Sequence, residues 1–458
     1  MYKEDTIAAI ATPPGEGSVA IVRVSGVDAE NIAAKIFQRA QGKSGRLESH
    51  RLYHGKICDQ KTARVLDEVL LTIMRKPRSY TGENVVEIYC HGGAFVVQRL
   101  LELVLTEGAR QAEPGEFTKR AFLNGRMDLT QAEAVLDLVR ARTEKSAGLA
   151  LNQASGVLSH WVDELREELL DILVQVETAI DFPEEEIELL RCRELSEKVF
   201  GLIDKISKIS VTYDWFKLFR EGAKVCICGC PNVGKSSLLN ALLGEDRVIV
   251  TPVAGTTRDV IEESINLNGL AVVLWDTAGI RDTDDQIERM GVDLARGYME
   301  KSDAAIIVLD GSAPLTVDDQ QLLDSARRRK ILVVINKSDL PQSLAEQELP
   351  PFICSTKVSR VSAKTGEGIS SLKQSLRELM VGSEINSSVV ITNLRHRSAL
   401  QRSEAALKRA VESLRDGYAS EFVAVDLNDA REALEEITGL INNEDILDRI
   451  FSSFCIGK

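Results

Sequence analysis

The stretch Gly229-Cys230-Pro231-Asn232-Val233-Gly234-Lys235-Ser236 decides the fold of this chain. It fits the P-loop pattern, in which a glycine and four further residues precede Gly-Lys-Ser. Residues 224–228, just before it, alternate like a short buried strand, and residues 237–243 begin a helix. A strand, a glycine-rich turn and a helix together form a nest of backbone N–H groups for phosphate oxygens. Lys235 would reach the outer phosphates, and the Ser236 hydroxyl would bind Mg²⁺.

A second motif, Asp276-Thr277-Ala278-Gly279, follows the apolar residues 271–275. A carboxylate at that strand end can hold the Mg²⁺ shell, and Gly279 lets the backbone approach the last phosphate. The next residue is Ile280, where Ras-like switches carry a glutamine that orients the attacking water. Because isoleucine cannot hydrogen-bond water through its side chain, hydrolysis must use another group. Four downstream acidic residues could swing in: Asp282, Asp284, Asp285 and Glu288.

Switch I is predicted at residues 251–259, Thr-Pro-Val-Ala-Gly-Thr-Thr-Arg-Asp, with a threonine for Mg²⁺. Its small side chains and carbonyl groups, together with Asn232, suit a large monovalent cation. Such an ion could supply the positive charge that an arginine finger supplies in other GTPases. The alternative is that Asn232 only shapes the loop.

Two further motifs are predicted to recognise the base. Asn336-Lys337-Ser338-Asp339 follows the apolar residues 331–335, and there the Asp339 carboxylate can accept from both N–H groups on the edge of guanine. Adenine offers the opposite pattern, so this site discriminates between the two bases. Ser362-Ala363-Lys364 follows Val361 and can support the base. The four motifs, in this order and spacing, predict GTP binding.

Composition narrows the class of protein. The chain has 458 residues, 44% of them hydrophobic, and a formal charge of −14, which argues against a protein that coats nucleic acid by charge alone. Its start lacks a signal peptide and no apolar run is long enough to span a membrane, so a soluble, cytoplasmic protein is expected. Cys226, Cys228 and Cys230 could suggest a metal cluster, but their spacing and the lack of a nearby histidine favour buried thiols.

Residues 1–120 are predicted to form a mixed α/β domain. Hydrophobic patterns indicate strands at 6–12, 18–25, 51–58, 65–74 and 84–90 and helices at 29–39 and 95–106. Arg23 and Glu87 are polar residues at strand positions, where a surface charge is the alternative to a functional role. Pro114-Gly115-Glu116 marks the end of this part.

Helices are predicted on both sides of the GTP module. Residues 121–219 begin with a capping box at Thr130-Gln131-Ala132-Glu133, run as helix to about 180, stop at Asp181-Phe182-Pro183 and resume from 193. Residues 220–380 alternate strand and helix, as in a Ras-like parallel sheet with helices on both faces. Residues 381–458 are helical again. One helical domain interrupted by an inserted G domain is expected, since each flank alone would leave an apolar face without a partner.

The helix expected at residues 392–415 carries the best local basic stripe of an acidic chain. A solvated helix face and an RNA footprint both account for it. Its cations are Arg395, Arg397, Arg402, Lys408, Arg409 and Arg415.

Motifs along the whole chain resemble the MnmE (also called TrmE) family of tRNA-modifying GTPases. The chain departs from the family at Glu113, where the family usually has arginine, and at Arg126, where it usually has lysine. The matching stretches are Ala11-Thr12-Pro13-Pro14-Gly15, Tyr80-Thr81-Gly82-Glu83, His91-Gly92-Gly93, Pro114-Gly115-Glu116-Phe117, Arg120-Ala121-Phe122-Leu123-Asn124, Asp181-Phe182-Pro183, Gly255-Thr256-Thr257-Arg258-Asp259 and the ending Phe454-Cys455-Ile456-Gly457-Lys458.

The resemblance implies roles for individual residues. Glu288 would position the attacking water, and Ser236 and Thr257 would bind Mg²⁺. Four positions match K⁺ ligands: Asn232, Thr256 and the carbonyl groups of Thr251 and Val253. Folate-binding positions are matched by Arg23, Glu87, Arg126 and Lys458, and Cys455 matches a cysteine proposed to matter in modification. The expected GTP-binding residues are Asn232, Val233, Gly234, Lys235, Ser236, Ser237, Thr251, Pro252, Val253, Ala254, Gly255, Thr256, Thr257, Asp276, Thr277, Ala278, Gly279, Asn336, Lys337, Asp339, Ser362, Ala363 and Lys364.

The resemblance also implies the biological role. The N-terminal domains would pair into a homodimer with a pocket for a formyl or methylene tetrahydrofolate. The protein would act with MnmG, which binds FAD and NADH, as a heterotetramer on carbon 5 of the wobble uridine of certain tRNAs. A GTPase switch in ribosome assembly is the alternative, and a folate-binding scaffold with a degenerate G domain is a third reading that the intact motifs disfavour. Neither a membrane nor DNA is expected as a partner.

Overall fold

The structure of the chain is a computed structural model. It describes residues 5–40, 46–62, 64–141, 143–181, 189–244, 262–267, 269–276, 297, 299–353, 358–382, 389–416, 418–441 and 444–458. The chain divides into two compact units. One contains Met1–Leu136, Gln153–Leu202 and Arg402–Lys458, and the other contains Asp137–Asn152 and Ile203–Gln401. No helix in the described ranges is long and apolar enough to cross a membrane.

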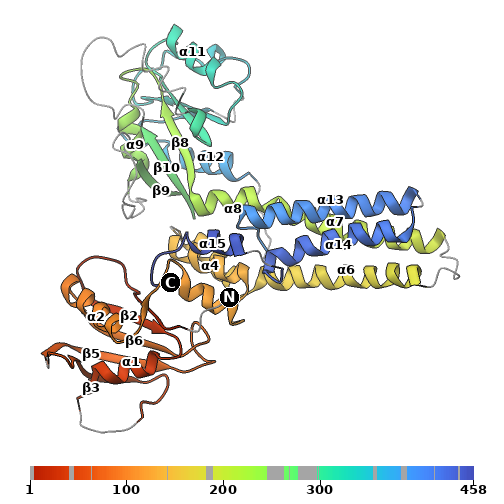
Figure 1. Ribbon diagram of the computed structural model, residues 1–458. Helices are drawn as coiled ribbons and strands as arrows, with labels where there is room; N and C mark the ends of the chain where they lie inside the picture. The colour runs from red at the N-terminus through yellow and green to blue at the C-terminus, as the bar shows by residue number, and fades with distance from the viewer. Residues whose placement is uncertain are drawn as a thin grey trace. The chain divides into compact units, whose positions relative to one another are not determined.

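The first unit begins with a seven-stranded sheet in the order β3-β4-β5-β6-β2-β1-β7. Its strands pair antiparallel except for β1 and β7, which are parallel. The helices α1 (Ala29–Ile36) and α2 (Ala94–Thr106) share one apolar core with the sheet (Figure 1). The strands are β1 (Ile7–Ile10), β2 (Gly17–Ser25), β3 (Phe37–Arg39), β4 (Leu52–Asp59), β5 (Arg64–Met74), β6 (Val85–Gly92) and β7 (Arg110–Gln111).

The helix predicted at residues 29–39 ends earlier than expected. Residues Phe37–Arg39 are instead the strand β3, which pairs with β4 through Gly55–Ile57. Gly55 permits this approach, because a Cβ there would collide with the Phe37 ring and the Gln38 carbonyl oxygen. Pairing with a distant strand therefore overrides the local helical pattern.

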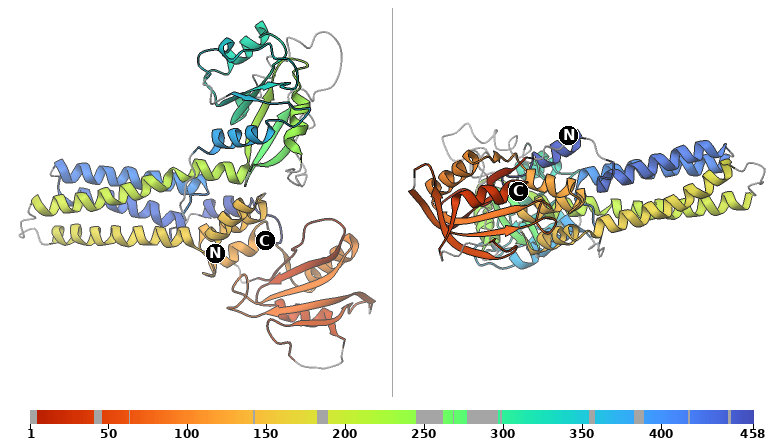
Figure 2. Two further views of the ribbon diagram at one scale, coloured as in Figure 1. Left: turned by 180° about the vertical axis from the view of Figure 1, so that it is seen from behind. Right: turned by 60° about the horizontal axis from the view of Figure 1, so that its bottom comes forward.

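The same unit contains a bundle of long helices. The views of Figures 1 and 2 agree that α6 (Val157–Asp181), α7 (Leu189–Ser210), α13 (Leu394–Asp416) and α14 (Ser420–Thr438) lie side by side. Shorter helices of this unit are α3 (Glu116–Leu123) and α15 (Glu444–Phe451). The helix α4 (Leu129–Arg140) begins in this unit, and α5 (Glu144–Ala154) belongs mostly to the second unit. Helical segments that precede and follow the GTP-binding motifs in the sequence thus fold into one unit, as expected for a helical domain that is interrupted by an insertion.

The capping box predicted at Thr130 is wrong, because α4 begins at Leu129. The Asp128 carboxylate accepts from the Gln131 backbone N–H at 2.9 Å, and the Gln131 side-chain oxygen accepts from the Asp128 N–H at 3.0 Å. This reciprocal cap lies two residues before the predicted one. The earlier start places Leu129 in the helix, where it packs in a core with Phe451.

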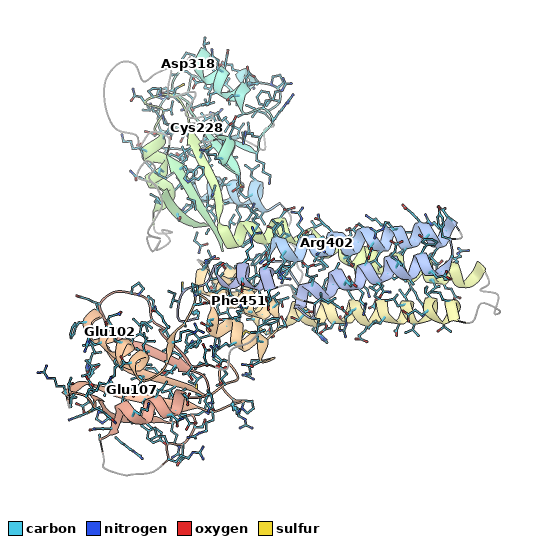
Figure 3. All side chains as sticks on the ribbon, in the orientation of Figure 1. Glu102, Glu107, Cys228, Asp318, Arg402 and Phe451 are labelled. Carbon is cyan, nitrogen blue, oxygen red and sulfur yellow. The ribbon has the colours of Figure 1, made fainter. Side chains whose placement is uncertain are left out.

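The second unit is built on a six-stranded sheet in the order β13-β12-β11-β8-β10-β9. The helices α8 (Thr212–Glu221), α9 (Lys235–Leu243) and α12 (Ile369–Val381) bury one face, and α11 (Val317–Ser325) buries the other. Cys226 and Cys228 lie in the core of the α11 face (Cys228 is labelled in Figure 3), consistent with the expectation of buried thiols. The strands are β8 (Ala223–Cys228), β9 (Glu262–Leu267), β10 (Leu270–Asp276), β11 (Ala304–Asp310), β12 (Ile331–Asn336) and β13 (Val358–Arg360).

The sheet is parallel except at one edge, where β9 pairs antiparallel with β10. The alternation of strand and helix predicted a parallel sheet and gave no signal for β9. A tight turn at Gly269, whose φ is 92°, joins the two strands, and the Asn266 side chain accepts from the Gly269 N–H at 2.7 Å. The two sheets and the helices confirm the predicted fold class, whereas the boundaries at 120, 219 and 380 stay predictions.

Candidate functional site

The P-loop joins the carboxyl end of β8 to the start of α9. Gly234 precedes the first helical residue, Lys235, and has a φ of 94°, in the left-handed region that favours glycine. A Cβ on Gly234 would also collide with the Asn336 side chain. The helix therefore begins with its backbone N–H groups at the loop, where the helix dipole favours a phosphate.

Two side chains of the loop have defined surroundings. The Lys235 ammonium group donates to the carbonyl oxygens of Gly229 and Cys230, each at 2.9 Å, so it lies over the loop. Burial and the neighbouring Asp319 raise the pKa of the Cys230 thiol to about 12, so this thiol stays protonated at neutral pH. Asn232 is exposed and has a φ of 63°, a strained conformation that asparagine tolerates better than most residues.

Asn336 joins the base-recognition motifs to the P-loop. It is buried at the end of β12, and its amide donates to the Val233 carbonyl oxygen at 2.8 Å. Its side-chain oxygen accepts from the Ala363 N–H at 3.0 Å. One amide thus connects the phosphate loop with the Ser362-Ala363-Lys364 loop, so the expected phosphate and base sites form one framework.

Asp339 presents its carboxylate at the surface beside this framework. One carboxylate oxygen accepts from the Ser362 hydroxyl at 2.7 Å, and this hydrogen bond lowers the pKa of Asp339. The side chain is therefore ionised and accepts hydrogen bonds without donating any at neutral pH. Such a group suits the two N–H donors on the edge of guanine.

Asp310, at the end of β11, was missed by sequence analysis. Its carboxylate forms an ion pair with the Lys337 ammonium group at 2.6 Å and accepts from Ser312 N–H and hydroxyl groups at 2.9 and 2.6 Å. Burial alone would raise the pKa of Asp310, but these hydrogen bonds outweigh it and lower the pKa. Lys337 has a φ of 66°, so the ion pair holds a strained residue of the base motif. An acidic residue at the end of an apolar strand was the signal in the sequence.

For some of the remaining residues that are predicted to bind the nucleotide, the structure gives only their position in a helix, strand or loop. Ser236 and Ser237 lie in the first turn of α9, and Asp276 closes β10, where its backbone pairs with Ile227 of β8. Hydroxyl groups are among the hard oxygen ligands that Mg²⁺ prefers, which is consistent with the predicted role of Ser236. Lys364 is exposed after the buried Ser362. Outside the described residues lie Thr251, Pro252, Val253, Ala254, Gly255, Thr256, Thr257, Thr277, Ala278, Gly279, Ile280, Asp282, Asp284, Asp285 and Glu288.

A second polar site centres on Arg23 in the first unit. Arg23 of β2 lies opposite Glu87 of β6, and their side chains form an ion pair at 2.9 Å. The other Glu87 oxygen accepts from the Tyr89 hydroxyl at 2.7 Å. The Arg23 guanidinium also lies 5.4 Å from the centre of the Tyr80 ring and 5.6 Å from that of Phe117. Tyr80 and Phe117 belong to motifs quoted above, but sequence analysis gave them no role.

The end of the chain closes onto this site. Arg23 donates to the carbonyl oxygen of Gly457 at 3.3 Å. Gly457 has a φ of 98°, and a Cβ there would collide with the Ile10 carbonyl oxygen, so only glycine brings the tail this close. Burial and the nearby Arg23 charge lower the pKa of Lys458. The structure thus brings Arg23, Glu87 and the tail together, although they are far apart in the sequence.

Arg126, the fourth expected folate residue, contacts the loop that precedes Tyr80. It is exposed, and its guanidinium donates to the Ser79 carbonyl oxygen at 3.1 Å, next to Tyr80. The exposed Cys455 precedes the tail residues. Two aromatic rings with cations and one oriented carboxylate suit a flat heteroaromatic ligand that carries N–H donors and an anionic group.

The basic stripe of α13 is largely neutralised within the protein. Arg402, labelled in Figure 3, pairs with Glu436, and Lys408 pairs with Glu404 at 2.7 Å. Arg409 pairs with both Asp426 and Asp429 at 2.7 and 2.8 Å. Elsewhere on the stripe, Arg397 pairs with Asp214 at 2.8 Å and Arg415 lies over the Phe200 ring. Four of the six cations of the stripe are thus paired with carboxylates of the chain.

Comparison with known proteins matches the chain over nearly its full length. Residues 6–126 match the family model described as GTP-binding protein TrmE N-terminus, and residues 129–455 match the MnmE helical domain. A Syntrophus aciditrophicus protein named tRNA modification GTPase MnmE is 48% identical over 99% of this chain and 100% of its own. Relatives with the same name from Geobacter sulfurreducens and Lactiplantibacillus plantarum are 47% and 46% identical, covering 100% and 99% of this chain and 100% and 98% of their own.

Solved structures resemble parts of the chain. The G domain of the T. maritima FeoB iron transporter is 29% identical and covers 34% of this chain and 98% of its own, with a TM-score of 0.27. A variant of Aquifex aeolicus Era bound to GDP and AlF4⁻ is 28% identical and covers 40% of this chain and 66% of its own, also with a TM-score of 0.27. The full-length relatives and the two family models carry the assignment that the sequence motifs predicted: the chain belongs to the MnmE family of tRNA modification GTPases.

Proposed function

We propose that this GTP hydrolase acts with MnmG to add a carboxymethylaminomethyl group at carbon 5 of the wobble uridine of certain tRNAs. The full-length relatives named tRNA modification GTPase MnmE support a tRNA substrate. The observation that carries the guanine-nucleotide part is the framework in which Asn336 joins the P-loop to the Ala363 loop beside the ionised Asp339.

Nucleotide binding would use both ends of this framework. The phosphates would lie on the N–H groups at the start of α9, with the Lys235 ammonium group leaving the loop carbonyls for the outer phosphates. Asp339 would accept from guanine, while Lys337 is held by Asp310. Mg²⁺ would be held by Ser236 and Thr257 and would neutralise charge that develops on the phosphates.

Hydrolysis would depend on groups that replace the missing glutamine at Ile280. Glu288 would position the attacking water. Asn232, Thr256 and the carbonyl groups of Thr251 and Val253 would hold K⁺, which when bound supplies positive charge beside the phosphates. We expect GTP turnover to rise strongly when K⁺ replaces Na⁺ at equal ionic strength, and equal turnover in the two salts would remove the ion from the proposal.

The second polar site would hold a formyl or methylene tetrahydrofolate as the source of the one-carbon unit. Arg23 and Lys458 offer positive charge, and Tyr89 and Arg23 orient the Glu87 carboxylate toward N–H donors of the ligand. Arg126, which contacts the loop that precedes Tyr80, would complete the site. The N-terminal segments, residues 1–120, would pair two chains into a homodimer, and MnmG would bring FAD and NADH in a heterotetramer.

Mass analysis of wobble uridines tests the proposal. tRNA from cells that lack this protein should lose the modified nucleoside, and restoring the wild-type chain should return it. Normal modification without the protein would reject the proposal. Normal modification together with co-sedimentation of the chain with ribosomal subunits would support the ribosome-assembly switch instead.

A further inference from the structure

A run of four cations, Arg327-Arg328-Arg329-Lys330, precedes β12 in the second unit. All four side chains are exposed, and none forms an ion pair with any carboxylate in the described part of the chain. Four cations of α13, by contrast, are paired with carboxylates: Arg397, Arg402, Lys408 and Arg409. Among the described residues, the run is therefore a patch of positive charge without a paired carboxylate, on a chain whose formal charge is −14.

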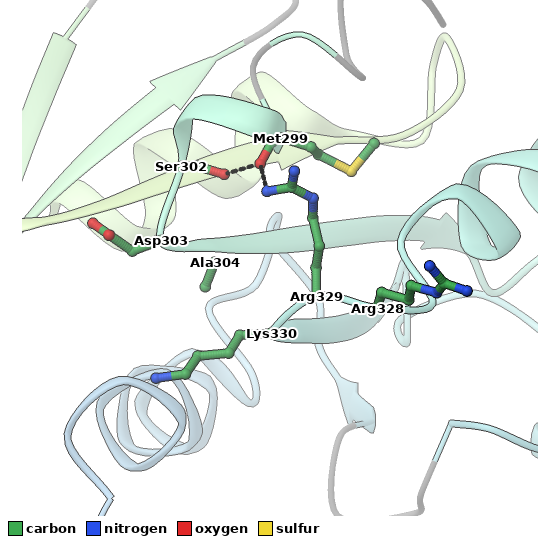
Figure 4. A pocket seen from close by; sticks show the side chains of 7 residues that line it. All are labelled: Met299, Ser302, Asp303, Ala304, Arg328, Arg329 and Lys330. Carbon is green, nitrogen blue, oxygen red and sulfur yellow. Dashed lines mark hydrogen bonds between the residues drawn. The ribbon is translucent and has the colours of Figure 1, made fainter.

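The last three residues of the run, Arg328, Arg329 and Lys330, form one wall of a cavity of about 310 Å³ (Figure 4). Met299, Ser302 and Asp303 form the opposite wall. Arg329 is anchored there, because its guanidinium donates to the Met299 carbonyl oxygen, which also accepts from the Ser302 hydroxyl at 3.1 Å. Figure 4 shows Arg328 and Lys330 extending to opposite sides of Arg329, so two cations flank a fixed one. We call this cavity with Arg328, Arg329 and Lys330 the basic cavity.

The basic cavity lies away from the nucleotide site. Its walls include Ala304 at the amino end of β11 and Lys330 just before β12, and the two strands run parallel. Asn336 lies at the opposite, carboxyl end of β12. Six residues of strand at about 3.3 Å each separate the two ends by roughly 20 Å. A ligand in the basic cavity therefore cannot be part of the bound GTP.

The walls indicate a ligand with both phosphate and hydroxyl groups. Arg328, Arg329 and Lys330 supply N–H donors and positive charge for phosphate. Asp303 is exposed at the wall, and its carboxylate already accepts from the Lys224 N–H at 2.8 Å. Its remaining lone pairs would repel a bare anion but accept from a hydroxyl group. The RNA backbone carries both groups, since each ribose has a 2′-hydroxyl that DNA lacks.

We propose that the basic cavity binds the ribose-phosphate backbone of tRNA. This inference rests on the proposed function for the identity of the RNA. It places the RNA contact at the edge of the G-domain sheet opposite the nucleotide, and it favours a solvated helix face over an RNA footprint for the stripe of α13. Phosphate contacts of this kind position an RNA without selecting its sequence.

A pair of charge-matched variants tests the proposal in the full-length protein. The test variant combines Arg328→Ala with Lys330→Ala, which spares the anchored Arg329. The control combines Arg402→Ala with Lys408→Ala, which removes the same charge from ion-paired positions. Binding of fluorescently labelled tRNA is measured by anisotropy over a series of salt concentrations, with thermal melting and tRNA-free GTP turnover as checks on folding.

The test variant should bind tRNA about tenfold more weakly at low salt, and the slope of log affinity against log salt should fall by about 1–2, as expected for two lost phosphate contacts. The control should bind within about twofold of wild type, and GTP turnover should not change in either variant. Asp303→Asn should retain tRNA binding, but the ratio of its affinity for RNA to its affinity for single-stranded DNA of the same sequence should fall.

Three results would overturn the inference. The first is wild-type affinity and slope in the test variant, and the second is an equal loss in test and control variants, which would indicate a general charge effect. The third is a test variant that binds tRNA like wild type but has lost binding to anionic lipid vesicles, which would make the basic cavity a membrane-binding surface. If the wild-type chain binds no tRNA, this inference fails, whereas the proposed function is still judged by wobble-uridine analysis.

Discussion

Replacing Asp339 by asparagine tests the guanine site most sharply. One oxygen of the Asp339 carboxylate accepts from the Ser362 hydroxyl at 2.7 Å. The remaining lone pairs of the carboxylate can accept from the two N–H groups of guanine. Hydrogen bonds to a charged partner contribute about 1.5–3 kcal/mol each. The Asp339 side chain is exposed before binding, so each hydrogen bond contributes at the lower end of that range, about tenfold in affinity. Asp339→Asn should therefore weaken GTP binding by about 10²–10³-fold.

The assay is a titration with a fluorescent GTP analogue, displaced by unlabelled nucleotides. Xanthosine triphosphate carries a carbonyl group where guanine carries its amino group, so the asparagine amide should favour it over GTP. Asp324→Asn, an exposed carboxylate on α11, is the matched control for the loss of one charge and should bind GTP normally. GTP affinity of Asp339→Asn within about threefold of wild type, with no gain for the xanthine nucleotide, would refute the reasoning.

The pH dependence of GTP binding gives an independent check on Asp339. Its hydrogen bond with Ser362 lowers the pKa, so the carboxylate keeps its charge from neutral pH down through the ordinary aspartate pKa of about 3.9. The contribution of Asp339 to GTP affinity should thus be constant between pH 8 and 5 and be lost only as pH falls below the ordinary value. A decline centred near pH 6 would contradict this assignment.

Three further variants test other parts of the account. Asp310→Asn breaks the ion pair with Lys337. Because both groups of the pair are partly exposed, the pair contributes about 1 kcal/mol, and GTP affinity measured by titration should fall about fivefold. Glu288→Ala should retain GTP binding but lose about 10²–10⁴-fold in single-turnover hydrolysis, and unchanged hydrolysis would remove Glu288 from the mechanism. Gly457→Ala should displace the tail and weaken folate binding in calorimetry, whereas Gly108→Ala, at a φ of 120° with open space around it, should not.

The nucleotide framework was largely predictable from sequence, because its motifs are local. Each motif follows a buried parallel strand, and the carboxyl ends of such strands meet at one edge of a sheet. That rule alone places Lys235, Asp276 and Asn336 together. It did not identify Asp310, although this residue ends the apolar strand β11 in the same way, because no motif marks it.

Features that depend on distant partners were not predictable in the same way. The strand β3 looks helical in isolation and exists because Gly55 lets β4 approach it. The strand β9 adds to the sheet edge in the antiparallel direction, which the alternation of strand and helix does not indicate. The helix α4 begins at Leu129 and is capped by Asp128 rather than Thr130, and Leu129 gains a buried position in the core with Phe451. In each case a tertiary contact outweighs the local pattern.

The second polar site, around Arg23, also could not be predicted from local sequence patterns. Arg23 and Glu87 could be surface charges on sequence grounds, and only strand pairing places them side by side. The chain end meets Arg23 because Gly457 adopts a backbone conformation that other residues rarely adopt. Sequence periodicity carries no information about such a contact, and only the resemblance to a family pointed to these residues.

The central claim is that GTP hydrolysis by this chain drives tRNA modification, and one measurement tests it most directly. Cells that lack the protein are restored with the wild-type chain or with Glu288→Ala at matched protein levels, and their wobble uridines are quantified by mass spectrometry. The account predicts full modification with the wild-type chain and a large loss with the variant that binds GTP without hydrolysing it. Full modification with a variant shown to be inactive in hydrolysis would contradict the claim.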